Sequence, residues 1–411
     1  MTPSAPQTVP SVVRPAIVYV LLYASIGAYF PYIAVFYREI GMSLAAVGGL
    51  LALSAAVGLV AAPVWGALAD RTRNLAGAIV LAGVWAAVGG AWLGVARDPV
   101  VVVMATAVLA AGASGMGPML DSLTIERLGD RRERYGRARA WGSAAFILGA
   151  LGTGTLIDRT GAPGLFVVFA PGLLFTSLAA YLLLRGGRSR RRVARLSPLE
   201  GVAGILRHPS LSLFLLGSVL VWTSVSAVTT FVSVHLVSLG AEGQVIGALW
   251  ALGALVEVPL MFLFPILARR IGNERLLVIA AIAFALRSIG WALAGQPLLL
   301  LAVAPLGGIG FGLFYVATVG YVARAVPSGV QATAQGVFSG TAFSTGSILG
   351  SLIGGQLASA VGLPVLFGVS GIVTGLAGLL VWWAIAAPGG PGRRTGMRPL
   401  VHEETVPTPA P

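Results

Sequence analysis

The chain has 411 residues, of which 57% are hydrophobic and only 10% are charged, and its mean hydropathy is +0.90. A soluble domain carries about 25% charged residues, so this composition excludes a soluble protein and predicts an integral membrane protein. The apolar stretches are about 20 residues long, which predicts spanning helices rather than the shorter strands of a membrane barrel. The absence of cysteine excludes disulfides and thiol chemistry.

The net charge of +13 comes from arginine, because the chain contains no lysine. The arginines concentrate in alternate loops, which is the positive-inside distribution of a membrane protein and not the basic face of a nucleic-acid-binding protein. These loops are therefore expected in the cytoplasm, and no nucleic-acid partner is expected. The predicted location is the cytoplasmic (inner) membrane of a bacterium, in a multi-pass arrangement.

Twelve apolar stretches are long enough to span a bilayer. Because their number is even, both chain termini are expected on one side of the membrane, and the arginine-rich loops make that side the cytoplasmic one. In chain order the predicted helices cover residues 14–37, 43–68, 75–96, 99–127, 137–158, 163–184, 210–237, 243–268, 275–295, 298–325, 330–358 and 363–386.

The longest loop, residues 185–209, is rich in arginine and divides the chain into two parts. We predict a six-helix bundle over residues 14–184, a cytoplasmic linker over residues 185–209 and a second six-helix bundle over residues 210–386. The proline- and serine-rich residues 1–13 and the C-terminal residues 387–411 are expected to be disordered tails.

Two short runs recur at nearly the same distance along the chain. The run GAPGLF at residues 161–166 resembles GLPVLF at residues 362–367, and Ala69-Asp70-Arg71 resembles Ala268-Arg269-Arg270. Such echoes predict two duplicated, pseudo-symmetric halves that are related by an axis along the membrane normal. Transporters built in this way hold their substrate near the midplane between the halves and rock one half against the other.

Asp121 lies inside the apolar part of the fourth predicted helix, and Arg139 lies at the beginning of the fifth. A carboxylate within a membrane helix costs several kcal/mol unless it faces a partner or a wet cavity, so it indicates a functional site. The alternative is a structural ion pair that locks the two helices together.

The loop after the second predicted helix contains Gly66, Asp70, Arg71 and Arg73. This run resembles the G-x-x-x-D-R-x-x-R signature of the major facilitator superfamily, although the inner glycine is absent and Arg73 comes one place early. The resemblance implies a gating and structural element. Gly66 would permit close helix contact, Asp70 would cap a neighbouring helix N-terminus, and the arginines would meet lipid phosphates.

A more specific resemblance lies in the runs GAYFP at residues 27–31 and YGRARAWGS at residues 135–143. The first is similar to lactose permease and its relatives, and the second is closer to the phenylpropionate permeases. The resemblance implies an all-α fold of twelve transmembrane helices and proton-coupled symport of a small organic solute. On this match Asp121 and Arg139 bind the solute.

Four aromatic residues are candidate walls of the same site, namely Tyr23, Tyr29, Trp141 and Phe146. Phe146 stands where the resemblance places the ring that stacks on a sugar. For the tyrosines of the first helix, packing in the core is an alternative that the sequence leaves open.

The run ALRSIG at residues 285–290 resembles the permease segment that carries its proton-site arginine, which implies this role for Arg287. The permease His and Glu of the next helix fall at Gly307 and Gly310, and glycine carries no proton. Glu257 lies about ten residues from the cytoplasmic end of its helix and Arg287 about twelve, which corresponds to depths of roughly 15 and 18 Å.

These similar depths predict that Glu257 and Arg287 pair and carry the proton linkage, with Asp121 as a further proton-binding group. A permanent structural pair between Glu257 and Arg287 is the alternative.

No phosphate-binding loop and no metal-spaced cluster occur in the sequence, so neither an enzyme nor a cofactor nor a metal site is expected. The expected partners are a small-molecule substrate (a sugar or an aromatic carboxylate), protons and membrane lipids, and the protein is expected to be a monomer. Two alternatives remain open: an exporter of amphipathic drugs by proton antiport, and a non-transporting membrane receptor or scaffold on the same fold.

Overall fold

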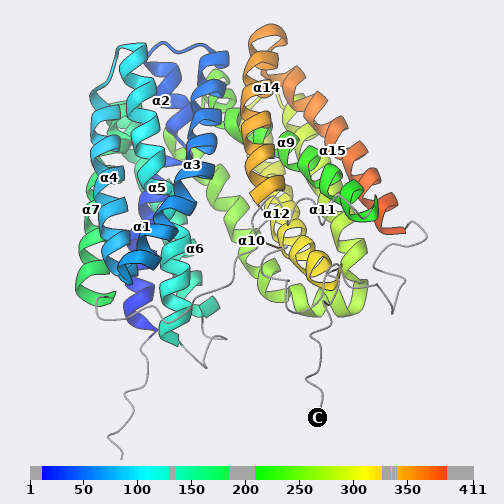
Figure 1. Ribbon diagram of the computed structural model, residues 1–411. Helices are drawn as coiled ribbons and strands as arrows, with labels where there is room; N and C mark the ends of the chain where they lie inside the picture. Colours follow the sequence, from blue (N-terminus) through cyan, green and yellow to red (C-terminus); the bar gives the residue numbers. More distant parts are fainter. Residues whose placement is uncertain are drawn as a thin grey trace, which may run out of the picture.

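The computed structural model describes residues 12–128, 135–184, 209–325, 335, 338 and 340–386, and the elements within these residues are helices. Figure 1 shows two groups of helices side by side. The first group contains α1 (Val13–Tyr29), α2 (Ile33–Glu39), α3 (Leu44–Thr72), α4 (Leu75–Val95), α5 (Pro99–Leu128), α6 (Tyr135–Thr160), η2 (Ala162–Gly164) and α7 (Leu165–Leu184). The second contains α9 (Pro209–Ser238), α10 (Gly243–Ile271), α11 (Asn273–Leu293), α12 (Pro297–Ala325), η3 (Gly340–Ser344), α14 (Thr345–Val361) and α15 (Leu363–Ala386).

Eleven helical segments among the described residues are long and apolar enough to cross a membrane, with α1 and α2 counted as one. The helices η3 and α14 form a further helical segment over residues 340–361, which is the twelfth. The prediction of a twelve-helix, multi-pass membrane protein is therefore confirmed. The predicted tails and linker lie outside the described residues, apart from residues 12, 13 and 209.

The first span is interrupted, whereas the sequence predicted a continuous helix over residues 14–37. The interruption falls at Pro31, which has no N–H to donate and whose ring clashes with the carbonyl four residues earlier. The chain turns through Phe30 and Tyr32, with the Tyr32 N–H donating to the Tyr29 carbonyl at 3.1 Å, before α2 begins.

The helix α1 begins and α15 ends at the same end of the molecule, the lower end in Figure 1. We call this the inner end, since the arginine-rich loops of the sequence follow helices that finish there, and we call the opposite end the outer end.

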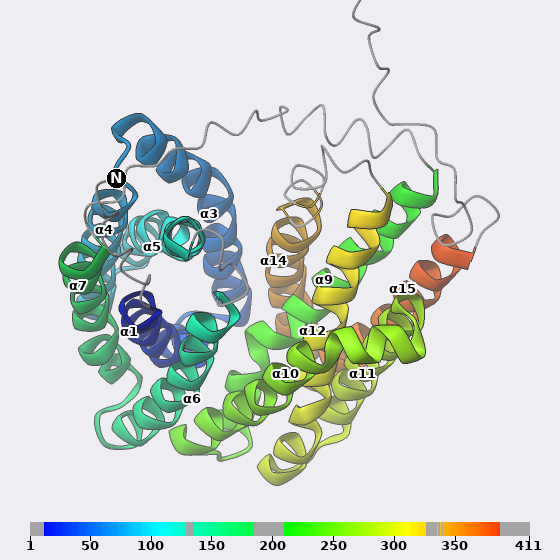
Figure 2. The ribbon, with the colours of Figure 1, turned by 90° about the horizontal axis from the view of Figure 1, so that it is seen from below.

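The two halves meet along two helix pairs, α3 with α14 and α6 with α10. Figure 2, a view from the inner end, shows both pairs at the seam between the halves. In a duplicated chain α3 corresponds to α10, and α6 corresponds to α14. The two contacts are therefore equivalent under exchange of the halves, as a pseudo-two-fold axis along the membrane normal requires.

Corresponding turns of the two halves share an unusual backbone conformation. Gly161 and Gly362, in the repeated run, have φ of 76° and 86°. The turn after α3 has Arg73 at φ 52°, and the turn after α10 has Gly272 at φ 93°. Arg73 is the non-glycine residue with positive φ among the described residues, and it stands where the facilitator signature has its inner glycine.

We expect Arg73→Gly to stabilise the protein. A left-handed conformation costs a side-chain-bearing residue roughly 1–2 kcal/mol, and the greater freedom of glycine in the unfolded chain offsets roughly 0.5–1 kcal/mol of the gain. The melting temperature, followed by tryptophan fluorescence, should rise by about 1–2 °C. Arg73→Ala removes the charge and keeps the strain, so an equal rise in that variant would assign the effect to charge. Gly272→Arg should lower the melting temperature.

Candidate functional site

The candidate site lies in the first half, where α1 and α6 approach with their backbones in contact. A Cβ atom on Gly27 would overlap the carbonyl oxygen of Phe146, and one on Gly149 would overlap that of Ala24. Small residues at such crossings let membrane helices pack closely. The close crossing brings Arg139, nearer the inner end of α6, beside the tyrosines of α1.

Asp121 and Arg139 each bind to a tyrosine of α1. The Tyr19 hydroxyl donates to Asp121 Oδ1 at 2.5 Å. The Arg139 guanidinium carbon lies 3.9 Å from the centroid of the Tyr23 ring and 6.0 Å from that of Tyr19. No salt bridge joins Asp121 to Arg139, two side chains that the structure describes, so they do not form the structural ion pair that the sequence left as an alternative.

In this arrangement the Arg139 guanidinium and the Asp121 carboxylate can still form hydrogen bonds to a ligand. Arg139 is held by the face of the Tyr23 ring, and guanidinium N–H groups lie in the plane of the group, so they remain available to a ligand. Tyr135 at the start of α6 also lies beside the Asp121 carboxylate, whose two oxygens can accept several hydrogen bonds. A donor fork and a carboxylate suit neighbouring hydroxyl groups, whereas the fork alone suits a carboxylate ligand.

Two of the four predicted wall residues are placed to line this site. Tyr23 contacts Arg139 directly. Phe146 lies seven residues after Arg139, about two turns along the same face of α6, and its side chain is half-buried.

The structure does not bring the other two predicted wall residues beside Arg139. Trp141 is 62% exposed, because two residues in a helix correspond to a rotation of about 200° and turn it away from Arg139. Tyr29 is stacked on Phe169 of α7, with ring centroids 4.4 Å apart, and packs inside the first half.

The expected pairing of Glu257 with Arg287 is not found. The helix α12 packs against both α10 and α11. Two adjacent glycines of α12, Gly307 and Gly308, face α11 and α10 respectively. A Cβ atom on Gly308 would lie 3.0 Å from the Glu257 nitrogen, and one on Gly307 would lie 3.0 Å from Arg287 Cδ. The two charged residues therefore lie on different faces of α12.

Arg287 is buried in the second half, with 4% of its surface exposed. Its guanidinium carbon lies 5.2 Å from the Phe284 ring centroid and 4.8 Å from that of Trp291. Its Nε and Nη2 atoms are buried and have no hydrogen-bond partner among the described residues. The glycine at position 307 makes room for this side chain, since a Cβ there would meet it.

Glu257 lies midway along α10 and is half-buried. Its carboxylate forms no hydrogen bond or ion pair within the described part of the chain. The helix α10 packs against α6, the helix that carries Arg139, so Glu257 and Arg139 belong to two helices that meet at the seam between the halves.

The residues of the facilitator signature lie at the inner end of α3. Gly66 is half-buried, and Asp70, Arg71 and Arg73 are exposed. The N-terminus of the next helix, α4, is capped by Asn74, whose side chain accepts from the Gly77 N–H at 2.8 Å.

The outer end is closed by a contact that the sequence analysis missed. The Asp158 carboxylate, near the end of α6, accepts hydrogen bonds from the N–H groups of Gly243 and Gln244 at the start of α10 in the other half. The residue before Gly243, Glu242, provides no side-chain cap of its own. The sequence did contain a signal for this contact, because Asp158 is an acidic residue at the outer end of the predicted helix 137–158, where few arginines occur.

Backbone contacts strengthen this closure. A Cβ atom on Gly154 would lie 2.5 Å from the Gly243 carbonyl oxygen, and the Tyr32 hydroxyl lies 3.2 Å from the same oxygen. At the other helix pair between the halves, α3 with α14, a Cβ atom on Gly355 would lie 3.0 Å from Gly48 Cα. At these points the backbones meet with no side chain between them, so the two halves are in close contact at the outer end.

Two six-helix halves related by a pseudo-two-fold axis along the membrane normal are the architecture of secondary transporters of the major facilitator type. The sequence profile of the MFS_1 like family matches residues 12–369, and the chain belongs to this family of major facilitator transporters. It is therefore a transporter and not an enzyme.

Relatives and solved structures agree with this assignment. The chain is 30% identical over 341 residues to maltose permease from Geobacillus stearothermophilus, which covers 82% of this chain and 86% of that protein. It is 23% identical over 361 residues to YwbF, an uncharacterised transporter of Bacillus subtilis, covering 87% and 89%. The crystal structure of the nucleoside transporter NupG superimposes with a TM-score of 0.81 at 14% identity and covers 92% of this chain and 99% of that one, which is a likeness of fold.

Proposed function

We propose that this protein carries a sugar into the cell together with a proton, as a monomer in the cytoplasmic membrane of a bacterium. The observation that supports this most is an arginine fork near a carboxylate, Arg139 and Asp121, each held by a tyrosine of α1 in the first half. The 30% identity to a maltose permease over most of both chains favours a sugar over an aromatic carboxylate.

Glu257 is the proposed proton-binding group, and Arg139 links it to the substrate. Arg139 on α6 and Glu257 on α10 belong to helices that pack against each other at the seam, so the positive charge of Arg139 would act on this carboxylate while no substrate is bound. A bound sugar that accepts hydrogen bonds from the Arg139 guanidinium would draw that group toward the first half. A half-buried carboxylate that loses its counter-charge binds a proton more readily, so sugar and proton would bind together. Arg287 is not in contact with this pair, and its predicted part in proton linkage remains to be tested.

We expect Glu257→Gln to abolish accumulation driven by a proton gradient while leaving exchange of the substrate intact. The measurement is uptake of radiolabelled maltose into proteoliposomes with an imposed inward gradient. One pH unit drives up to about tenfold accumulation when one proton moves with each sugar, and the variant should only equilibrate. Glu274→Gln is the matched control, because Glu274 forms an exposed salt bridge to Arg324 at 3.2 Å, away from the site.

The remaining outcomes separate the alternatives. Equilibration without accumulation in the wild type would indicate a uniporter. Efflux of amphipathic compounds against inward proton movement would indicate an exporter. Binding of maltose without any flux would indicate a receptor.

A further inference from the structure

Tyr19 of α1 is fully buried beside the two charged residues of the proposed site. None of its surface is exposed, and its hydroxyl donates to Asp121 Oδ1 at 2.5 Å. Hydrogen bonds from a hydroxyl to an ionised carboxylate are this short because the charge strengthens them. The ring of the same tyrosine lies 6.0 Å from the Arg139 guanidinium carbon. Tyr19 is therefore close to both charges, but it forms a hydrogen bond only with the acidic one.

Other aromatic rings hold Tyr19 in this position. Its ring centroid lies 6.2 Å from that of Tyr23 at an interplanar angle of 30°, and 6.5 Å from that of Tyr135 at 80°. A buried ring that packs against two others has no space into which it can swing. A hydroxyl that left the carboxylate would also be buried without a partner. The oxygen that accepts from Tyr19 is therefore fixed in place.

Arg139 is held separately, by a side chain that carries no charge. Its guanidinium carbon lies 3.9 Å from the centroid of the Tyr23 ring. Gly142, three residues later on α6, leaves the space for this contact. A Cβ atom at that position would lie 3.0 Å from Tyr23 Cδ2 and 3.3 Å from Arg139 Nη1. The contact between the ring and the guanidinium thus depends on a glycine at this turn of the helix.

The separation of the two charges is unusual for groups that lie so close to one side chain. A carboxylate and a guanidinium attract each other, and a two-pronged ion pair is their preferred arrangement when both are free to turn. Asp121 and Arg139, both of which the structure describes, do not form such a pair. An ion pair would occupy the donors and acceptors that a ligand needs.

We propose that Tyr19 is a positioning residue that holds Asp121 apart from Arg139, so that the empty site presents a separate acceptor and a separate donor fork. Without the Tyr19 hydroxyl, Asp121 turns to Arg139, and a ligand has to break the resulting ion pair before it binds. The inference rests on the proposed transport of a sugar, and it identifies a residue that sets the affinity of that site without touching the sugar.

The first test is the kinetics of Tyr19→Phe, which keeps the ring and removes the donor. If the ion pair forms in about nine tenths of the empty carriers, the apparent affinity falls about tenfold. The KM for maltose uptake into proteoliposomes should therefore rise about tenfold, and kcat should stay within about twofold, because the occupied site no longer contains the pair. Tyr37→Phe is the matched control. It removes a fully buried hydroxyl that bonds to Thr106 at 2.8 Å, and it should leave KM unchanged.

The second test needs no transport and compares the effect of Tyr19→Phe on the melting temperature in two backgrounds. In the wild type the new ion pair replaces the lost hydrogen bond, so the melting temperature should fall by less than about 1 °C. In Arg139→Met there is no guanidinium for Asp121 to meet, and the same change should lower it by about 2–4 °C. Tyr37→Phe should have the same effect in both backgrounds.

The two tests fail separately. Equal losses of melting temperature in the two backgrounds, with an unchanged KM for maltose, would show that the Tyr19 hydroxyl only stabilises the fold. That result would overturn the proposed role of Tyr19 and leave sugar transport standing. Unequal losses in a protein that takes up no maltose would support the role of Tyr19 and overturn sugar transport.

Discussion

Replacement of Arg139 by lysine is expected to lower kcat/KM for maltose at least about 100-fold, although the charge is kept. The guanidinium rests on the Tyr23 ring at 3.9 Å and offers a planar fork of donors. An ammonium group presents a compact charge that cannot bind two neighbouring hydroxyls in the same geometry. Two hydrogen bonds to a charged group, at roughly 1.5 kcal/mol or more each, account for a loss of this size. The measurement is the initial rate of uptake into proteoliposomes.

Arg137→Lys is the matched control for this substitution. Arg137 lies on the same helix two residues earlier and is exposed, and its variant should transport within about twofold of the wild type. If both lysine variants transport normally, the arginine serves only as a positive charge at the seam, and the proposed contact between its fork and the sugar is incorrect.

Asp158→Ala should open the outer end. Asp158 accepts two N–H groups at the start of α10 from the other half, where the partial positive charge of the helix terminus adds to the attraction. Loss of charge-assisted hydrogen bonds worth about 2–3 kcal/mol would shift the balance between closed and open outer ends on the order of 100-fold. A single cysteine at Ser351, a buried residue of α14 whose carbonyl lies against Gly48 of α3, should then react faster with an impermeant maleimide added from outside.

Asp98 provides the control. Its carboxylate accepts the N–H groups of Val100 at 2.9 Å and Val101 at 3.2 Å at the start of its own helix, α5, so that it caps a helix without joining the halves. Asp98→Ala should lower the melting temperature through loss of the cap and leave labelling at Ser351→Cys within about twofold. Equal labelling in both alanine variants would show that the contact at Asp158 does not hold the outer end closed.

Sequence alone predicted the twelve spans because apolar length determines which segments cross a membrane. It missed the break at Pro31, since a proline in a membrane helix is often accommodated by neighbouring groups. The repeated glycine runs predicted the duplication, and the structure relates them to equivalent turns at Gly161 and Gly362.

The sequence predicted those parts of the candidate site that depend on the position of a residue within a single helix. Arg139 and Phe146 share a face of α6, and an apolar helix makes the charge of Asp121 conspicuous. The pairing of Glu257 with Arg287 was inferred from depth, and depth gives the height of a residue along its helix but not the neighbour that it faces. Packing of α12 between α10 and α11 decided that question.

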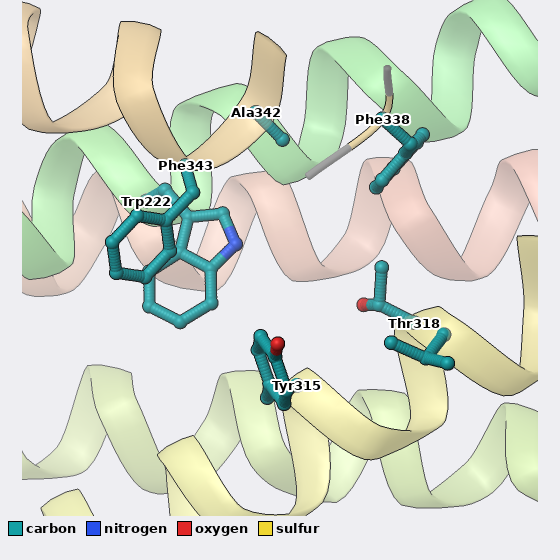
Figure 3. Close-up of a pocket in the computed structure, with 7 residues that line it drawn as sticks. Trp222, Tyr315, Thr318, Phe338, Ala342 and Phe343 are labelled. Carbon is teal, nitrogen blue, oxygen red and sulfur yellow. The ribbon is translucent and has the colours of Figure 1, made fainter. Parts of the chain in front are cut away.

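The aromatic cluster of Trp222, Tyr315 and Phe343 (Figure 3) could not be found from sequence, because these residues come from α9, α12 and η3 and no spacing rule joins these segments. Tyr315 and Phe311 are four residues apart on one helix, and this pair was the available local signal.

The position of Arg287 has a consequence for the energetics of transport in a living membrane. Arg287 forms no ion pair with Glu257, and its Nε and Nη2 atoms have no hydrogen-bond partner among the described residues, so no carboxylate there balances its positive charge. Moving one charge across the full membrane costs or releases about 2.3 kcal/mol per 100 mV. If rocking of the second half carries Arg287 through part of the electric field, the membrane voltage, negative inside, favours the conformation that holds this arginine nearer the cytoplasm.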